Sequence, residues 1–428
     1  MTYRPVLDNG MAIVAVENAT AEIVAARIFI GAGSCRQTRQ QAGLAHLLAA
    51  VMTKGTENWS SMEIAEKVES VGASLGTEAT PDYFLLSLKT VTSDFEPMLH
   101  LAGELLRSPV FPEAEVELER RLTLQAIRSQ KEQPMSIAFD RLRRNLYGDH
   151  PYAISSLGLA ETVAELTRAD LQRYHQTYFR PDNIVVSLTG CTQPEAAVAQ
   201  IEKVFGDWKA PPTPLPPYDF PEIFPQPRHS IVPQDTQQSI VMLGYLAPSI
   251  APDTLFQGKP SDYASLKLLS TYLGNGLSSR LFVELREKRG LAYDVSAFFP
   301  TRRATSHFIA YMGTAPQNTK IALDGLRFEI DRLREVLLSE EELQTAKNKL
   351  LGQYALGKQT NAQIAQLNGW YEMLGLGIEF DRGFVDAITA VTPEIAQETA
   401  RRYLTEPYIS LVGPESAVNQ NLTNHSLT

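Results

Sequence analysis

A single histidine, His46, lies in a stretch with the pattern of a metal-binding helix, GLAHLLAAVMTKGT at residues 43–56. On a helix, residues three and four positions apart share a face, so Ala49 and Ala50 lie beside His46. Two imidazoles one turn apart can bind a metal ion, and a carboxylate between them can activate a metal-bound water. Because both neighbouring positions are alanines, this face keeps one candidate ligand.

The other metal-ligand residue types do not replace what this helix lacks. The chain has seven histidines, and the six besides His46 show no metal-ligand spacing among themselves. Cys35 and Cys191 are far apart in sequence and form no CxxC motif, so we interpret both as small buried hydrophobic residues. A zinc site assembled from remote segments stays open as an alternative. We interpret His46 itself as a hydrogen-bonded structural residue.

Length and composition indicate a cytoplasmic protein with more than one domain. The chain has 428 residues, 44% of them hydrophobic, which is enough to bury a large core. No apolar run reaches the roughly 20 residues needed to cross a bilayer. The first residues lack the features of a signal peptide and predict two strands around a turn at Asn9 and Gly10. The net charge of -10 argues against a nucleic-acid partner.

A proline-rich stretch at residues 208–228 divides the chain, because neither a helix nor a central strand continues through it. We therefore predict an N-terminal domain at residues 1–212, a linker at 213–228 and a C-terminal domain at 229–428. The two halves resemble each other. Aligning Thr167 with Thr392 and aligning Val116 with Leu343 give nearly the same offset.

The order of elements in each half predicts the fold class. Each half opens with apolar strands, continues through a helix and alternating strands, and then carries long amphipathic helices. Strands grouped before helices indicate an α+β arrangement in which helices cover an antiparallel-rich sheet. The sequence thus predicts two homologous α/β sandwich domains.

Several motifs together resemble one family of enzymes. GLAH, the KGT that follows it, and the flanking GAGSCRQ and ENWSSMEIAEKVESVGA are similar to the pitrilysin/insulinase family of zinc peptidases, which includes the mitochondrial processing peptidase. The resemblance covers essentially the whole chain and implies the family's clamshell-type fold. It also implies a His-x-x-Glu-His helix, in which two histidines bind zinc and the glutamate activates water, with a distal glutamate ligand from a second helix.

Compared residue by residue with that motif, the chain has lost the metal chemistry. His46 matches the first histidine, whereas the resemblance places Ala50 at the second histidine and Ala49 at the water-activating glutamate. The distal glutamate position falls at Ala126, and Glu119 matches a carboxylate that lies behind the ligands in the family. We expect no catalytic residue and no metal in this chain, and zinc in a partner subunit.

The C-terminal half keeps its own family segment, YLGNGLSSRLFVELREKRGLAYDVSAFF, in which the resemblance implies an arginine and a tyrosine that reach the bound peptide. These are Arg286 and Tyr293. A guanidinium and a phenol can donate hydrogen bonds to a substrate carbonyl or to an oxyanion. Alternatively, Arg286 pairs with Glu284 or Glu287, and Tyr293 belongs to the edge of the core. Arg289 competes for the role of Arg286.

The resemblance implies a division of labour between two homologous subunits. We expect a zinc-free subunit, inactive alone, that supplies chamber walls and the Arg/Tyr pair to a heterodimeric metallopeptidase acting on unfolded peptides. The partner would carry the intact His-x-x-Glu-His motif, and the peptide would bind extended at a sheet edge. The alternative is a structural core-type or peptide-binding protein with no role in proteolysis.

Overall fold

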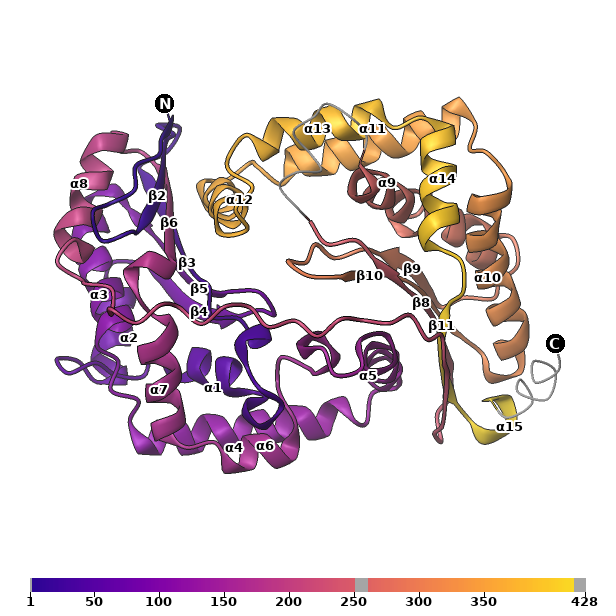
Figure 1. Cartoon of the computed structure of the whole chain (residues 1–428), viewed down its shortest axis with the longest axis horizontal. Helices are drawn as coiled ribbons and strands as arrows, with labels where there is room; N and C mark the ends of the chain where they lie inside the picture. Colours follow the sequence, from indigo (N-terminus) through magenta and orange to yellow (C-terminus); the bar gives the residue numbers. More distant parts are fainter. Residues whose placement is uncertain (1, 251–260, 419–428) are drawn as a thin grey trace. The chain divides into compact units, whose positions relative to one another are not determined.

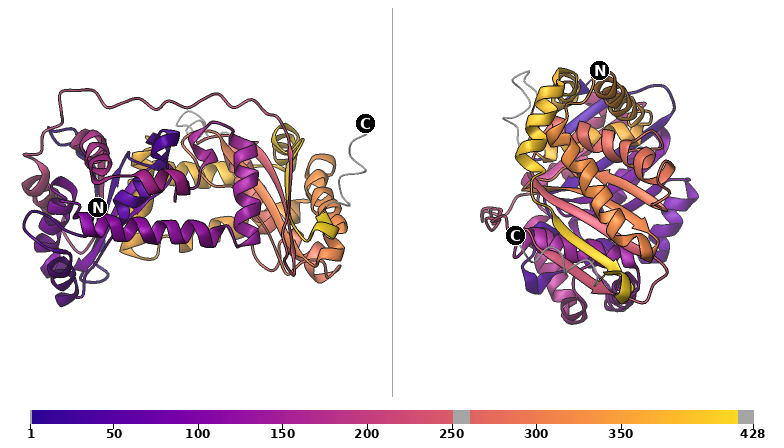
Figure 2. Two further views of the ribbon diagram at one scale, coloured as in Figure 1. Left: turned by 90° about the horizontal axis from the view of Figure 1, so that it is seen from below. Right: turned by 90° about the vertical axis from the view of Figure 1, so that its right-hand side faces the viewer.

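The computed structural model describes residues 2–250 and 261–418, which form two compact units with one sheet each (Figure 1). Among the described residues, the first unit consists of the chain up to Ile127, Ile154–Asp219 and Ala355–Ile378. The second unit consists of Arg128–Ala153, Phe220–Tyr354 apart from residues 251–260, and the chain from Glu379 onward. Residues 208–228 contain neither helix nor strand (Figure 2).

The first sheet has the strand order β1-β2-β6-β3-β5-β4. Its strands are β1 (Thr2–Tyr3), β2 (Ala12–Glu17), β3 (Ile23–Ile30), β4 (Ser74–Ala79), β5 (Phe84–Val91) and β6 (Ile184–Gly190). β2 and β6 are parallel, and the other neighbours are antiparallel. The predicted turn between the first two strands is confirmed, with Gly10 at a φ of 91° that favours glycine.

The second sheet repeats this arrangement, with the order β7-β11-β8-β10-β9. Its strands are β7 (His229–Pro233), β8 (Ser239–Ala247), β9 (Asp294–Phe298), β10 (Ser306–Thr314) and β11 (Tyr408–Gly413). β7 and β11 are parallel and the other neighbours antiparallel, which matches β2-β6-β3-β5-β4 strand for strand. The predicted duplication and the fold class are therefore confirmed.

Helices cover both sheets. The first unit contains α1 (Leu44–Val51), α2 (Ser61–Ser70), α3 (Phe95–Arg107), most of α4 (Glu113–Gln130), α6 (Ala160–Glu165), α7 (Arg168–Tyr178), α8 (Pro194–Phe205) and α12 (Asn361–Met373). The second contains α5 (Pro134–Tyr147), α9 (Asp262–Gly274), a π-helix η7 (Phe282–Glu287), α10 (Thr319–Glu335), most of α11 (Glu340–Leu356), α13 (Phe380–Ala390), α14 (Pro393–Tyr403) and α15 (Glu415–Val418). Short 3-10 helices are η1 (Ser34–Arg36), η2 (Arg39–Gln41), η3 (Thr92–Asp94), η4 (Pro151–Ala153), η5 (Pro181–Asn183) and η8 (Pro316–Asn318). Across the two described ranges, no helix combines the length and apolar character that a membrane span requires.

The aligned helices of the two halves begin in the same way. Thr167 caps α7 and Thr392 caps α14. In each case the side-chain oxygen accepts a hydrogen bond from the backbone N–H of the residue three positions later. Val116 of α4 and Leu343 of α11 are both buried. α1, α3, α4 and α7 thus correspond to α9, α10, α11 and α14 in chain order.

Each sheet is apolar on both faces because helices cover both sides. In the first sheet, alternate residues of β3 such as Ile28 contribute to the main core, whereas Phe29 faces a smaller cluster that includes Trp370 of α12. Figure 1 shows α12 on one face of this sheet and α3 and α8 on the other. In the second sheet, α5 lies on one face and α9, α10 and α14 lie on the other (Figure 1).

Two helices belong to the unit of the opposite sequence half. α5 follows α4 in the first half but packs on β8 and β11, and α12 follows α11 in the second half but packs on β3 and β6. Glycines allow the close approach in each case: a Cβ on Gly244 of β8 would meet Leu142 of α5 at 3.0 Å. The predicted domains divide the chain at the linker. The compact units differ from these domains because α5 and α12 each belong to the other unit.

Gly369 of α12 provides a test of this packing. A Cβ at Gly369 would lie 2.4 Å from Cε2 of Phe29 and 2.7 Å from Cβ of Ser187. We expect Gly369→Ala to lower the free energy of unfolding by about 1–3 kcal/mol in urea denaturation, because the helix must move away from the sheet. The matched control, Gly352→Ala in α11, meets no atom within 4 Å. It is expected to stabilise by up to about 1 kcal/mol, and equal effects of the two changes would contradict this packing.

Buried histidines predict loss of stability in acid. Burial lowers the pKa of His175 to about 4 and that of His307 to about 3, with Arg302 adding to the shift at His307. The unfolded chain therefore binds more protons between the ordinary histidine pKa of about 6.5 and these values, so stability falls as the pH decreases through that window. By about pH 5 we expect His175 alone to cost on the order of 2 kcal/mol.

Urea unfolding at several pH values tests the contribution of His175. His175→Phe should flatten the pH dependence between about pH 6.5 and 4, because the group that takes up the proton is gone. His100→Phe, a change at an exposed histidine of α3, serves as the control and should leave the slope as it is. A wild-type profile that is flat over this range would contradict the prediction.

Candidate functional site

The predicted metal helix is α1, which is built into the core of the first unit. It begins after Gly43, whose φ of 100° favours glycine and whose N–H donates to Oε1 of Gln37 at 3.1 Å. The helix buries most of its side chains, namely Leu44, Ala45, Leu47, Leu48, Ala49 and Val51. His46 and Ala50 are half-buried on the remaining face.

The partly buried position of His46 favours its neutral imidazole form. Burial lowers its pKa, and the carboxylate of Glu119 opposes the shift in part. Within residues 2–250 and 261–418, no group forms a hydrogen bond with its ring. The interpretation of His46 as a hydrogen-bonded structural residue therefore finds no partner within the described protein residues.

The alanines at the other motif positions leave no donor atoms for a metal. Ala49 is 5% exposed, and its carbonyl accepts a hydrogen bond from Oγ1 of Thr77 in β4 at 2.7 Å. Ala126 is exposed on α4. Glu119 forms an ion pair with Lys54, whose Nζ lies 3.1 Å from Oε1.

The described part of the chain holds no group of three or more histidine, cysteine, aspartate or glutamate side chains that could bind a metal. Alanine has no side-chain donor, and the carboxylate of Glu119 already has a cation beside it. The residues present at the motif positions therefore do not fit a zinc ion.

Arg286 lies on a π-helical turn of the second unit. The N–H of Lys288 donates to the carbonyl of Val283, five residues back, so the turn is wider than that of an α-helix. Turns of this kind are frequent at functional sites. The Arg286 side chain is exposed, and its guanidinium lies 5.0 Å from the centre of the Phe282 ring.

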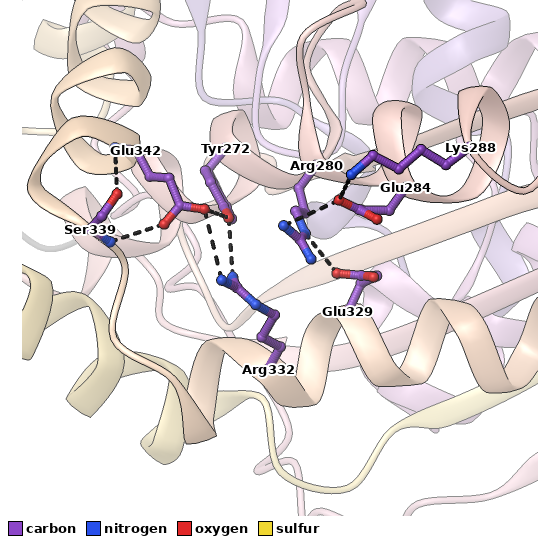
Figure 3. Close-up of polar contacts among 8 residues, drawn as sticks. All are labelled: Tyr272, Arg280, Glu284, Lys288, Glu329, Arg332, Ser339 and Glu342. Carbon is purple, nitrogen blue, oxygen red and sulfur yellow. Dashed lines mark hydrogen bonds and ion pairs between the residues drawn. The ribbon is translucent and has the colours of Figure 1, made fainter.

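The neighbouring carboxylates are engaged by other cations. Glu284 accepts from Nζ of Lys288 at 2.8 Å and lies 3.4 Å from Nη1 of Arg280 (Figure 3). The hydrogen bond from Lys288 lowers the pKa of Glu284, and the charge of Arg280 contributes. In the part of the chain that the structure covers, Arg286 has no ion-pair partner, so the alternative that it pairs with Glu284 is not what the fold shows.

Arg289, the rival for the role of Arg286, is engaged with a buried carboxylate. Its Nη2 lies 3.6 Å from Oε1 of Glu329, whose side chain is 0% exposed. Glu329 also accepts a hydrogen bond from Nε of Arg280 at 2.8 Å (Figure 3). Of the two arginines, Arg286 is therefore the one available to a ligand.

Tyr293 is exposed next to an edge strand. It is 64% exposed, and its backbone N–H donates to the carbonyl of Gly313 at 2.9 Å immediately before β9 begins. This exposure excludes the alternative that Tyr293 is an ordinary residue of the core edge. Its phenol, like the guanidinium of Arg286, is a hydrogen-bond donor that faces solvent.

The helix that carries His46 and the segment that carries Tyr293 each lie beside the last strand of their own sheet. α1 packs on β4, and Tyr293 leads into β9, which corresponds to β4 in the repeat. A strand at the end of a sheet has backbone groups without a neighbouring strand and is a template for an extended peptide. The arrangement thus places candidate residues next to an edge strand in each unit.

Glu329 belongs to none of the motifs that the sequence shows. On α10 it lies on the same face as Ala322, Leu326 and Leu333, three or four residues apart from one to the next, and all four are buried. A carboxylate at a core-facing position of an amphipathic helix is the signal that could have identified it.

Two family models match the chain. Residues 12–159 match the Insulinase (Peptidase family M16) model, and residues 165–350 match the Peptidase M16 inactive domain model. Together the matches cover most of the chain. It belongs to peptidase family M16, the insulinase family. The resemblance described from the sequence motifs is therefore confirmed.

Individual relatives agree with this assignment over nearly the full length. A Bacillus subtilis protein named as an uncharacterized zinc protease is 26% identical over 419 residues, covering 97% of this chain and 98% of that protein. An uncharacterized zinc protease from Mycobacterium bovis is 27% identical over 422 residues, covering 97% of this chain and 93% of that protein.

Solved structures share the fold. The crystal structure of a peptidase M16 inactive domain from Pseudomonas fluorescens gives a TM-score of 0.88 at 25% identity, covering 97% of this chain and 98% of that chain. The crystal structure of a protease from Helicobacter pylori gives a TM-score of 0.87 at 21% identity, covering 96% of this chain and 98% of that chain. These structures confirm the two-unit M16 architecture.

Proposed function

We propose that this M16 chain is the zinc-free subunit of a heterodimeric metallopeptidase that degrades or processes unfolded peptides in the cytoplasm. A homologous partner with an intact His-x-x-Glu-His motif supplies the zinc site. One contrast carries the proposal: the motif positions hold Ala49, Ala50 and Ala126, whereas Arg286 and Tyr293 stay exposed as donors. The chain has lost the metal ligands and kept the groups that can contact a peptide.

The chemistry of Arg286 and Tyr293 suits an auxiliary role. A guanidinium and a phenol donate hydrogen bonds to a peptide carbonyl, and these bonds strengthen as negative charge develops on that oxygen in the transition state. In the proposed complex, the chain also contributes part of the wall of a chamber that it shares with its partner. Because such a chamber limits water, hydrogen bonds to the developing charge contribute most there.

Peptide binding is proposed to use an edge strand. β4 in the first unit and β9 in the second each end their sheets, so either can add an extended peptide through main-chain hydrogen bonds. Such bonds make little demand on side chains, which predicts broad sequence selectivity. Folded proteins do not offer a free extended strand, which restricts substrates to unfolded peptides.

The experiment compares the isolated chain with the reconstituted heterodimer in a quenched-peptide cleavage assay, with zinc determined in parallel. The isolated chain is expected to be metal-free and inactive, and the heterodimer to contain zinc and cleave. Cleavage by the isolated chain would overturn the proposal. An assembled complex whose activity is the same as that of the partner alone would favour the structural or peptide-binding alternative.

A further inference from the structure

A cavity of about 290 Å³ lies in the second unit between α9, the start of the π-helical segment and α11, and Arg286 and Tyr293 do not line it. Its polar lining includes Tyr272, Ser279, Arg280, Glu284, Glu342 and Lys349. This volume is at the lower end of the range for ligand pockets, about 300–1,000 Å³. The cavity therefore suits a ligand the size of one or two amino-acid residues.

The internal repeat gives this place a counterpart in the first unit. α9 corresponds to α1 and α11 corresponds to α4, so the cavity lies between the two helices that match those of His46 and Glu119. In the first unit, Lys54 pairs with Glu119 at this place. In the second unit, the cavity lies at this place.

Most charges that line the cavity are already satisfied within the unit (Figure 3). Arg280 pairs with Glu329 and Glu284. Glu342 accepts from the Tyr272 hydroxyl at 2.7 Å and from the backbone N–H of Ser339 at 2.9 Å. These groups form a fixed wall that needs no ligand for charge balance.

Two other groups in the lining are less fully engaged: the hydroxyl of Ser279 has no hydrogen-bond partner, and the ammonium of Lys349 has no carboxylate partner among the described residues. Ser279 is 2% exposed, and its Oγ has no hydrogen-bond partner among the described residues, an arrangement that costs free energy in a buried site. The ammonium of Lys349 donates to the carbonyl of Asn275 and to Oγ of Ser278 at 3.4 Å, both neutral groups. Burial lowers the pKa of Lys349, and none of the carboxylates that the structure describes forms an ion pair with it.

One further group supplies the opposite charge. Glu341 also lines the cavity, two helical turns before Lys349 on the same face of α11. Its side chain is exposed, and it has no ion pair with any residue in the described ranges. A ligand with one carboxylate and one ammonium group matches this pair of charges.

We propose that the cavity binds a small zwitterion, whose carboxylate accepts hydrogen bonds from Lys349 and Ser279 and whose ammonium group pairs with Glu341. A lysine ammonium has three N–H donors, so one stays available beside the bonds to Asn275 and Ser278. A free amino acid and a dipeptide both present this chemistry and both suit the volume. The binding takes place in the isolated chain and does not depend on the proposed heterodimer.

Isothermal titration of the purified full chain tests this site with L-alanine, L-alanyl-L-alanine and acetate as probes. Both zwitterions are expected to bind more tightly than acetate, and whichever of the two binds more tightly identifies a free amino acid or a peptide as the source. Lys349→Met should weaken binding at least tenfold, because a charged hydrogen bond is lost, and Ser279→Ala by a few-fold. Glu341→Gln should weaken the zwitterions but not acetate.

Two controls separate binding from folding. Lys320→Met, a change at a lysine of α10 outside the cavity lining, should leave every affinity unchanged. Ser279→Ala should keep or raise the melting temperature of the unliganded chain, because its Oγ makes no hydrogen bond to lose and is costly to bury. The proposal is overturned if the folded wild-type chain binds none of the probes at millimolar concentration, or if Lys349→Met binds them as tightly as the wild type.

Discussion

Replacement of both Arg286 and Tyr293 by alanine in the reconstituted heterodimer should lower peptide turnover by roughly 100-fold or more, with assembly intact. Loss of a single donor to a developing oxyanion costs on the order of 100-fold or more in kcat. Because both side chains are exposed, their removal leaves no cavity in the core. Steady-state kinetics on a quenched unfolded peptide, with size-exclusion chromatography of the complex, measure both parts of the prediction.

The arginine three residues further along provides the matched control. Arg289→Ala removes the same guanidinium from the same segment, but that group is paired with Glu329. Turnover should therefore stay within a few-fold of the wild type. Unchanged turnover in the Arg286 and Tyr293 double variant, with the complex intact, would remove the enzyme-subunit interpretation and favour a structural or peptide-binding role.

Glu329→Gln should lower the free energy of unfolding by roughly 2–4 kcal/mol. Removing one partner of a buried ion pair is strongly destabilising, because the other charge loses its compensation. Glu329 is fully buried and accepts from Arg280, whose side chain is 23% exposed and also lies 3.4 Å from Glu284. Because Arg280 is partly solvated and keeps Glu284 as a second partner, we expect the loss of unfolding free energy to lie toward the lower end of the range for a broken buried ion pair.

Urea denaturation compares this variant with Glu335→Gln, which makes the same chemical change at an exposed position of the same helix. The control should change stability by less than about 0.5 kcal/mol. If the two variants unfold at the same urea concentration, the ion pairs of Glu329 do not stabilise the second unit.

Local patterns account for the parts of the fold that the sequence predicted. The alternation in β5 and β10 and the matching helix starts at Thr167 and Thr392 act over a few residues, so they are visible in the sequence alone. The repeat of these patterns was enough to predict two homologous sheets. It could not assign α5 and α12, because an amphipathic helix does not specify which apolar sheet it will cover.

The site was predictable where one helix carries the information. The spacing of His46, Ala49 and Ala50 is a property of α1 alone. The choice between Arg286 and Arg289 depends instead on Glu329, a residue of another helix that becomes a neighbour only in the folded unit. For the same reason, the cavity lined by Ser279 and Lys349 left no signal in the sequence.

A tagged pull-down of this chain from its native source, followed by zinc analysis and a quenched-peptide assay on the eluate, tests whether the chain works as the zinc-free subunit of a heterodimer. We expect a homologous chain with an intact His-x-x-Glu-His motif to co-elute, in a complex that contains zinc and cleaves the peptide. A chain that elutes alone, metal-free and inactive, would contradict this expectation.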